Sequence, residues 1–139
     1  MTTDTTAHTP EQPKGVLSTL VQAMPADTNQ WGDIFGGWLL SHMDVAGGIY
    51  CLSIAHGRVA TIAIDSMEFH EKVDVGDVLY CYVDLMKVGR SSVTVLIQAW
   101  VHRGGHPDRS EKVTEGHFTY VAVDSNGRPR PIPKDTVAV

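Results

Sequence analysis

The feature that most constrains the fold is one long helical repeat of apolar residues, followed only by segments that repeat every two residues. Within residues 35–55, apolar side chains recur at steps of four, four, three and four, which places them on one side of an α-helix. These residues are Phe35, Leu39, Met43, Ala46 and Tyr50. No later segment repeats this spacing, so the sequence predicts a single long helix.

The other sides of this predicted helix are apolar as well. Trp38, Leu40, Ile49 and Leu52 spread the apolar character around most of its circumference, so we expect burial on nearly all sides. One sheet face buries only one side of a helix, so the remaining apolar surface of the helix must be buried by another part of the protein or by another chain. A symmetric homodimer is the simplest cover. The alternative cover is the N-terminal tail, whose polar composition makes it less suitable.

The remaining apolar segments alternate with a period of two, as half-buried β-strands do. Strands are predicted within 15–24, 58–69, 77–88, 93–101 and 113–123. The short VGRS connection between the third and fourth of these segments has turn chemistry and predicts a β-hairpin. One strand, one helix and four more strands predict an α+β fold in which a single helix packs on an antiparallel sheet.

Composition narrows the class of protein. Of the 139 residues, 42% are hydrophobic and 19% charged, which excludes an intrinsically disordered chain and a membrane protein. The formal net charge of −5 argues against a broad nucleic-acid surface, which needs clustered Lys and Arg. Residues 1–12 lack the positive start and apolar stretch of a signal peptide. We therefore expect a cytoplasmic protein with neither a nucleic-acid nor a membrane partner.

The length predicts a single domain, which we place at residues 15–133. Residues 1–14 are predicted to form a disordered tail, and residues 134–139 a C-terminal tail. Cys51 and Cys81 lack CxxC spacing and are interpreted as buried small apolar residues. Without an HExxH motif or a Cys-His cluster, no metal site is expected.

Two aspartates are candidates for chemistry. Asp44 lies in the middle of the predicted helix among Met, Val, Ala and Gly, where a carboxylate is poorly solvated unless it is paired or functional. A general base is one interpretation of Asp44, and a structural hydrogen bond to a backbone group is the other. Asp33 precedes the helix, where an aspartate is commonly an N-cap.

The spacing of the two aspartates predicts how they are used. They differ by 11 positions, close to three helical turns, so both would point the same way but about 16 Å apart along the axis. Two helices packed antiparallel about a twofold axis would bring Asp33 of one chain toward Asp44 of the other. The sequence therefore predicts two identical composite sites in a dimer.

Gly36 and Gly37 stand in the first turn of the same helix. Their N–H groups, at the positive end of the helix dipole, suit a carbonyl oxygen that becomes an oxyanion. The alternative is that the two glycines permit close packing of helix on sheet.

Four separate motifs resemble one family, in its order and spacing. They are MPADTNQWGDIFGGWLLSHMDVAGG, AHGRVATIAIDSMEFHEKVDVGD, KVGRSSV and FTYVAVDSNGRPRPIP, spread over about residues 17–133. The chain resembles the hotdog-fold acyl-CoA thioesterases, most closely the short bacterial YciA type. The resemblance implies a long helix wrapped by an antiparallel sheet, dimers that commonly assemble as trimers of dimers, and hydrolysis of acyl-CoA to free acid and CoA.

The resemblance also implies roles for individual residues. Asp44 matches the family's catalytic carboxylate, as general base or nucleophile, and the motif before the helix supplies a second polar group. Many relatives have Asn where this chain has Asp33, so polarising the thioester, positioning water and capping the helix all stay open for it. The family's CoA segment matches Lys87, Gly89, Arg90, Ser91 and Ser92.

Physical chemistry agrees with the CoA segment, because an arginine and hydroxyls at a hairpin turn suit phosphate oxygens. Arg58 and Thr61 are weaker candidates for contacts with CoA, and a solvated strand end is the alternative for Arg58. No cofactor is expected, because CoA is part of substrate and product. Two other functions remain open: a hotdog hydratase or dehydratase, for which the expected histidine is missing, and a non-catalytic acyl-CoA sensor.

Overall fold

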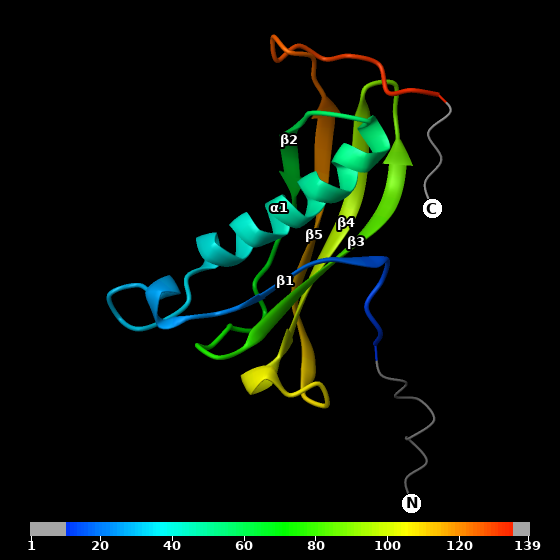
Figure 1. Cartoon of the computed structure of the whole chain (residues 1–139). Helices are drawn as coiled ribbons and strands as arrows, with labels where there is room; N and C mark the ends of the chain where they lie inside the picture. The colour runs from blue at the N-terminus through cyan, green and yellow to red at the C-terminus, as the bar shows by residue number, and fades with distance from the viewer. Residues whose placement is uncertain (1–10, 135–139) are drawn as a thin grey trace, which may run out of the picture.

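The computed structural model describes residues 11–134, in which one α-helix packs on one five-stranded antiparallel sheet (Figure 1). The elements in chain order are β1 (Val16–Gln22), a 3₁₀ turn η2 (Pro25–Asp27), α1 (Gly36–Ala55), β2 (Val59–Asp65), β3 (Val78–Val88), β4 (Ser92–His102), a 3₁₀ turn η3 (Arg103–Gly105) and β5 (Ser110–Ala122). The strand order is β1-β3-β4-β5-β2. This arrangement confirms the predicted α+β, hotdog-type fold.

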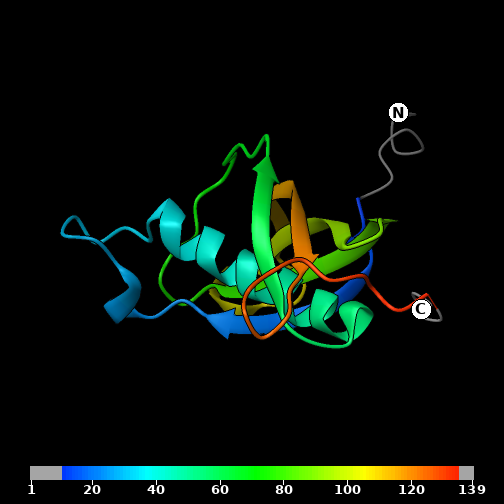
Figure 2. The same ribbon diagram turned by 90° about the horizontal axis from the view of Figure 1, so that it is seen from above.

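The helix α1 follows its apolar repeat closely. Leu39, Met43 and Ala46 are buried against the sheet and Tyr50 is half-buried, as predicted. Phe35 differs, because it is the N-cap residue with extended backbone and lies outside the helix. Among the residues described, α1 contacts all five strands and lies across one face of the sheet in both views (Figures 1 and 2).

The predicted alternation of buried and exposed residues holds in β3 and β5 but not in the edge strand β2, which is exposed on both faces beyond Val59. Leu79, Cys81 and Val83 of β3 are buried, as are Phe118 and Tyr120 of β5. The strand β5 begins three residues earlier than predicted, at Ser110, and these extra residues pair with the end of β4. Ser110 and Glu111 are exposed, so no apolar alternation marks this extension in the sequence.

The outer face of β4 is buried as well, at Leu96, Gln98 and Trp100. Here the chain before β1 contacts the sheet: the Lys14 N–H donates to Gln98 Oε1 at 3.0 Å, and the Lys112 ammonium pairs with Glu11 at 2.6 Å. The described part of the predicted N-terminal tail, residues 11–14, is thus docked on the sheet. Residues 1–10 and 135–139 lie outside the described part of the chain.

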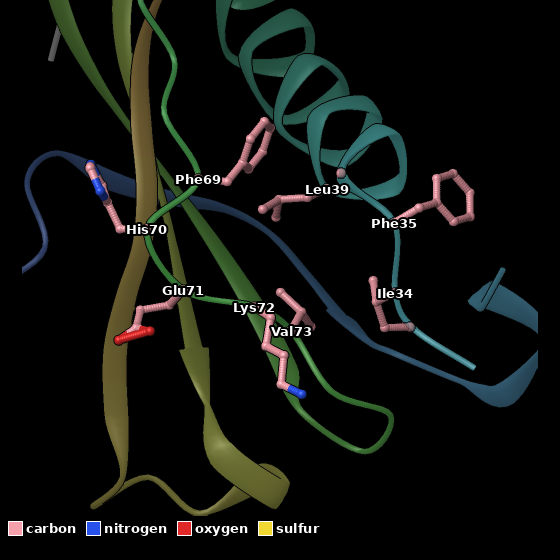
Figure 3. Close-up of a pocket in the computed structure, with 9 residues that line it drawn as sticks. Ile34, Phe35, Leu39, Phe69, His70, Glu71, Lys72 and Val73 are labelled. Carbon is pink, nitrogen blue, oxygen red and sulfur yellow. The ribbon is translucent and has the colours of Figure 1, made fainter. Parts of the chain in front are cut away.

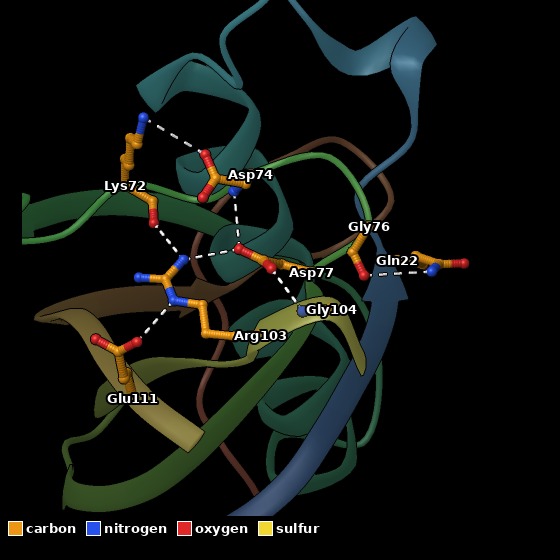
Figure 4. Close-up of polar contacts among 8 residues, drawn as sticks. All are labelled: Gln22, Lys72, Asp74, Gly76, Asp77, Arg103, Gly104 and Glu111. Atoms are coloured by element: carbon orange, nitrogen blue, oxygen red, sulfur yellow. Dashed lines mark hydrogen bonds and ion pairs between the residues drawn. The ribbon is translucent and has the colours of Figure 1, made fainter. Parts of the chain in front are cut away.

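A buried ion pair fastens the connection between β2 and β3 to the turn η3 (Figure 4). Arg103 Nη1 donates to Asp77 Oδ2 at 2.7 Å and to the Lys72 carbonyl at 2.7 Å, and the Gly104 N–H donates to Asp77 Oδ1 at 2.9 Å. Burial by itself would raise the pKa of Asp77, but the hydrogen bonds from the Asp74 and Gly104 N–H groups and from Arg103 outweigh it and lower that pKa. The connection that follows β2 is therefore held rigidly at its far end.

The two cysteines lie in the core as predicted. Cys51 and Cys81 are both fully buried and unpaired with each other, and burial raises the pKa of their thiols to about 12 and about 11. A thiol with such a pKa stays protonated at neutral pH and has little nucleophilic character.

The outward face of α1 and the edge strand β2 leave apolar surface exposed. Val45, Ile49 and Leu52 on the helix are each more than half exposed, and Ile62 of β2 is 58% exposed. The sheet covers one side of the helix and leaves the other open, as the all-round apolar sequence predicted. No helix in residues 11–134 is long and apolar enough to cross a membrane.

Candidate active site

Asp44 lies in the middle of α1, half-buried, with its carboxylate facing two hydroxyl groups from the sheet. Thr61 Oγ1 donates to Asp44 Oδ1 at 2.7 Å, and the Tyr120 hydroxyl lies 3.0 Å from the same oxygen and 2.8 Å from the Asp44 carbonyl. In the described chain no backbone N–H donates to this carboxylate, so the alternative of a structural bond to a backbone group is wrong. The second oxygen, Oδ2, accepts no hydrogen bond from residues 11–134 and is available to a ligand.

One cross-strand pair delivers both hydroxyls. Thr61 of β2 and Tyr120 of β5 are directly opposite each other in the antiparallel register, which shifts immediately beyond them, between Thr61 and Ala63. Directly paired side chains point to the same sheet face about 5 Å apart. The pair therefore places two donors side by side beneath one carboxylate.

Gly47 makes room for the Tyr120 hydroxyl under the helix. A Cβ at this position would lie 2.2 Å from the Tyr120 oxygen and 2.5 Å from Ile97 Cδ1. Close approach of helix and sheet therefore depends on Gly47. From the sequence, close packing of helix on sheet is one alternative for Gly36 and Gly37, and this prediction is wrong: a Cβ there would make only ordinary contacts of 3.4–3.7 Å with Phe69 and Phe35.

Asp33 lies three residues before α1, outside the helical spiral. It is not the N-cap, so the capping interpretation is wrong, and the spacing of three turns to Asp44 does not apply to a non-helical residue. The loop around it is shaped by Asn29, whose Oδ1 accepts from the Trp31 and Asp33 N–H groups at 2.9 and 3.1 Å. The Asp33 side chain is exposed and accepts no hydrogen bond from the described residues.

The N-terminus of α1 borders a cavity of about 350 Å³ (Figure 3). Phe69 and Leu39 point toward one another across it, whereas the Phe35 ring points away. The N–H groups of Gly36 and Gly37 have no acceptor among residues 11–134, and both glycines are exposed. The cavity is lined by apolar side chains, including Leu39 and Phe69, and by polar residues at 70–72. Beside N–H groups without an acceptor at a helix N-terminus, such a cavity suits a short acyl group with its carbonyl end.

The predicted CoA segment forms the β3–β4 hairpin, closed by the Gly89 N–H donating to the Ser92 carbonyl at 2.7 Å. Arg90 and Lys87 are exposed, and Ser91 and Ser92 are half-buried. The end of the described chain lies against this turn, because the Ile132 N–H donates to the Arg90 carbonyl at 2.8 Å and Ile132 is buried. Between turn and chain end runs a groove of about 660 Å³, lined by residues 88–90 and 131–134.

Arg58 begins the segment that leads into β2 and is exposed, beside the open apolar surface of Val45, Ile49 and Leu52. Its carbonyl accepts from the Val123 N–H at 3.0 Å, and its side chain makes no ion pair within residues 11–134. Thr61, which the sequence groups with Arg58 as a weaker candidate for a CoA contact, donates a hydrogen bond to Asp44, and its contact with CoA stays a prediction.

The candidate residues fall into separate places on one protomer. Gly36 precedes Asp44 by eight residues, about 12 Å along the helix axis. The helix N-terminus and the β3–β4 hairpin lie on opposite sides of the protomer in both views (Figures 1 and 2). One chain thus assembles the carboxylate with its two hydroxyls but does not bring this cluster to the glycine pair or to Arg90.

Sequence reasoning missed Tyr120 as a site residue and Gly47 as its necessary neighbour. The period-two pattern of residues 113–123 places Tyr120 on one face with Phe118 and Ala122, but it does not show which strand pairs with which. The available signal was a buried tyrosine, because a buried phenol usually finds a hydrogen-bond partner.

Comparison with known proteins identifies the family of this chain. Residues 32–106 match the model of the thioesterase superfamily. The acyl-CoA thioester hydrolase YciA of Escherichia coli K12 is 48% identical over 130 residues, covering 92% of this chain and 97% of the relative. A solved hexameric broad-specificity acyl-coenzyme A thioesterase is 50% identical, with a TM-score of 0.85 over 90% of this chain and 86% of the other.

A second solved structure, the hexameric thioesterase y2039 of Yersinia pestis, is 48% identical, with a TM-score of 0.83 over 88% of this chain and all of the other. The match therefore extends over nearly the whole length of the relatives, in sequence and in fold. This chain belongs to the thioesterase superfamily and, within it, to the YciA-type acyl-CoA thioester hydrolases.

Proposed function

We propose that this protein hydrolyses acyl-CoA thioesters to a free carboxylic acid and CoA, with Asp44 as the general base. The observation that carries the proposal is the Asp44 carboxylate, which has one oxygen held by two hydroxyls and the other open. The open oxygen takes a proton from water as that water attacks the thioester carbonyl. Collapse of the tetrahedral intermediate breaks the C–S bond, and the CoA sulfur leaves as thiolate and takes up a proton.

The intermediate's oxyanion needs hydrogen-bond donors near Asp44, and the helix that carries Asp44 offers them only about 12 Å away. In a dimer whose two α1 helices pack antiparallel about a twofold axis, Gly36 and Gly37 of one protomer approach Asp44 of the other. Two preorganised N–H groups at the positive end of a helix would then stabilise the developing charge. Asp33, exposed before the same helix, would face this composite site and position water or the thioester.

The CoA moiety is bound by the β3–β4 hairpin in this proposal. Arg90 supplies a planar, permanently charged guanidinium for a phosphate, and Lys87 a second positive charge. Gly89, Ser91 and Ser92 supply backbone and hydroxyl donors at the turn, and Arg58 a further cation. This local positive charge makes binding of a polyanionic nucleotide compatible with the net charge of −5.

We place the enzyme in the cytoplasm as a homo-oligomer built from dimers, arranged as a trimer of dimers. The exposed apolar face of α1 and the open edge of β2 support the dimer, and the two solved relatives are themselves hexameric. Two buried free cysteines suit a reducing compartment. The reaction needs no cofactor, and no nucleic-acid or membrane partner is proposed.

Two other functions predict different results. A hydratase would need a proton-donating histidine beside the carboxylate, and among residues 11–134 the hydrogen-bond partners of Asp44 are a threonine and a tyrosine. A sensor would bind acyl-CoA and leave the thioester intact.

The test is to incubate the protein with short-, medium- and long-chain acyl-CoAs while free thiol is followed with a thiol reagent. Release of CoA with turnover supports hydrolysis, and tight binding without thiol release contradicts it. A single turnover in H₂¹⁸O then separates the two roles for Asp44. A general base places the label only in the product acid. A nucleophile forms a mixed anhydride, and attack of water on its Asp44 carbonyl places the label in the Asp44 carboxylate, so label found there shows the nucleophilic route.

A further inference from the structure

Tyr120 is the most deeply buried hydroxyl that contacts the proposed reaction centre. Its side chain is 1% exposed, and its hydroxyl lies 2.8 Å from the Asp44 carbonyl and 3.0 Å from Asp44 Oδ1. One phenolic proton serves one acceptor at a time or is shared between the two. The hydroxyl therefore lies within hydrogen-bond distance of both the backbone carbonyl and the side-chain carboxylate of Asp44.

We propose that Tyr120 is a positioning residue that holds the Asp44 carboxylate in its reactive orientation by donating a hydrogen bond from beneath the helix. The proposal rests on the function proposed above. Thr61 Oγ1 reaches the same Oδ1 atom at 2.7 Å. Two donors on one oxygen fix the rotation of the carboxylate and leave Oδ2 directed at the attacking water.

The surroundings of the Tyr120 hydroxyl keep it protonated, so that it can always donate a hydrogen bond. Burial, together with the adjacent Asp44, raises the pKa of Tyr120 far above its usual range, so the phenol keeps its proton at any pH of an activity assay. Apart from Asp44, the titratable group that faces it from the described chain is Cys51, whose thiol pKa is raised to about 12 and which is likewise neutral. The hydroxyl is therefore a permanent donor.

Packing gives the hydroxyl no alternative position. The Phe118 ring stacks beside the Tyr120 ring at 6.4 Å between centroids and 12° between planes. Above the hydroxyl, Gly47 leaves only enough space for the oxygen itself, since a Cβ there would lie 2.2 Å from it. The helix and the tyrosine thus meet at a single spacing, and Asp44 is one turn away from that contact.

The test compares Tyr120→Phe with the wild type in kcat, KM and pH profile. A positioning role lowers kcat about tenfold with KM within twofold, because the lost bond acts on the base and not on substrate binding. Loss of a donor to the charged carboxylate favours its protonated form, so the acidic limb of kcat moves to higher pH. Tyr80→Phe is the matched control, because the Tyr80 ring stacks on His102 and its hydroxyl makes no hydrogen bond within residues 11–134.

A double-mutant cycle with Thr61→Val adds a readout that simple packing would not give. If both hydroxyls act on one oxygen, their effects on kcat are not additive. If Tyr120→Phe does not fold, 3-fluorotyrosine encoded at position 120 keeps the ring shape and donates more strongly, which moves the acidic limb to lower pH. An unmoved limb and unchanged kcat overturn the proposal. Failure of the proposed function is distinct, because then the wild type releases no CoA or Asp44→Asn stays active.

Discussion

The middle of α1 differs from the two other candidate regions, the N-terminus of α1 and the β3–β4 hairpin, in how much of the site one chain completes. At the middle, Thr61 and Tyr120 reach the Asp44 carboxylate at 2.7 and 3.0 Å, so the cluster proposed to transfer the proton lies within one chain. At the N-terminus of α1, the Gly36 and Gly37 N–H groups have no acceptor within residues 11–134. The β3–β4 hairpin, which carries Arg90, lies on the other side of the protomer (Figure 1).

The difference teaches which part of the chemistry depends on folding and which on assembly. A general base must be oriented to a fraction of an ångström, and a cross-strand pair inside one fold does this well. An acyl-CoA is long, and the groups proposed to bind its two ends are far apart on one chain. In the dimer proposed above, assembly about a twofold axis would bring the glycine pair of one protomer to the Asp44 cluster of the other.

Asp44→Asn tests the intramolecular part most directly. Asparagine is nearly isosteric and still accepts from Thr61, so we expect a folded protein that binds CoA but hydrolyses at least about a hundredfold more slowly. The residual activity should also lose the acidic limb of the pH profile. Thiol release, circular dichroism and CoA titration measure the three quantities.

Two further aspartates calibrate the result of Asp44→Asn. Asp108→Asn removes an equal charge at an exposed turn and should change nothing. Asp33→Asn should cost less than Asp44→Asn, because positioning water or the thioester needs a polar side chain, whereas a general base needs the carboxylate charge. Near-normal turnover by folded Asp44→Asn would show that the general-base assignment is wrong.

Ile49→Glu tests the part that depends on assembly. Ile49 is 54% exposed on the apolar face of α1, so a buried glutamate in a dimer would carry a large desolvation cost and separate the protomers. Hydrolysis should then fall about a hundredfold, as expected when oxyanion donors are removed, while the Asp44 cluster remains folded. Sedimentation velocity gives the mass, and thiol release gives the activity.

Ser125→Glu is the matched control for Ile49→Glu, because Ser125 is exposed in a polar turn. It should leave both mass and activity unchanged. A fully active monomeric Ile49→Glu protein would contradict the two-protomer site.

Asp77→Asn tests whether the buried Asp77–Arg103 ion pair, which holds the β2–β3 connection to the turn η3, stabilises the fold. The substitution leaves Arg103 without its buried charge partner, and we expect a loss of about 2 kcal/mol in the free energy of unfolding at pH 7. Because the folded-state pKa of Asp77 is lowered, its contribution is present above the unfolded pKa of about 3.9 and is lost as the pH falls through the lower folded value. Urea unfolding at pH 7 and pH 3 should therefore show the gap between the two proteins closing in acid.

Asp74→Asn is the control for Asp77→Asn, because the ion pair of Asp74 with Lys72 is 3.6 Å long and both side chains are more than half exposed. Such a pair contributes at most about 1 kcal/mol. Equal losses from Asp74→Asn and Asp77→Asn would show that the buried pair has no special role.

The sequence predicted the fold well because its two periods are physically distinct. Steps of three and four define one helix face and steps of two define sheet faces, and burial follows them in α1, β3 and β5, whereas β2 is exposed on both faces beyond Val59. The boundary at Phe35 was wrong by one residue because the apolar repeat continues into a non-helical N-cap. The extension of β5 was invisible because Ser110 and Glu111 face solvent.

The site was predicted less completely, for a different reason. Asp44 stood out because a carboxylate is costly inside an apolar helix. Tyr120 did not, because its role depends on the register of β2 against β5, which no local pattern encodes. Asp33 was interpreted through helical spacing, which fails for a residue before the helix begins.

Arg90→Ala should have the smallest effect on activity, because it changes only the β3–β4 hairpin that is proposed to bind CoA. Arg90 is exposed at the β3–β4 turn and makes no ion pair within residues 11–134, so its removal should not disturb the fold. A phosphate contact made equally in ground and transition states raises KM without changing kcat, and we expect a rise of about tenfold with kcat within twofold. The rise should also shrink at high salt, because the contact is electrostatic and exposed. Arg109→Ala removes an exposed arginine from the β4–β5 connection and should leave KM unchanged. A normal KM for Arg90→Ala at low salt would place the CoA phosphates away from this hairpin, while leaving the Asp44 cluster untouched.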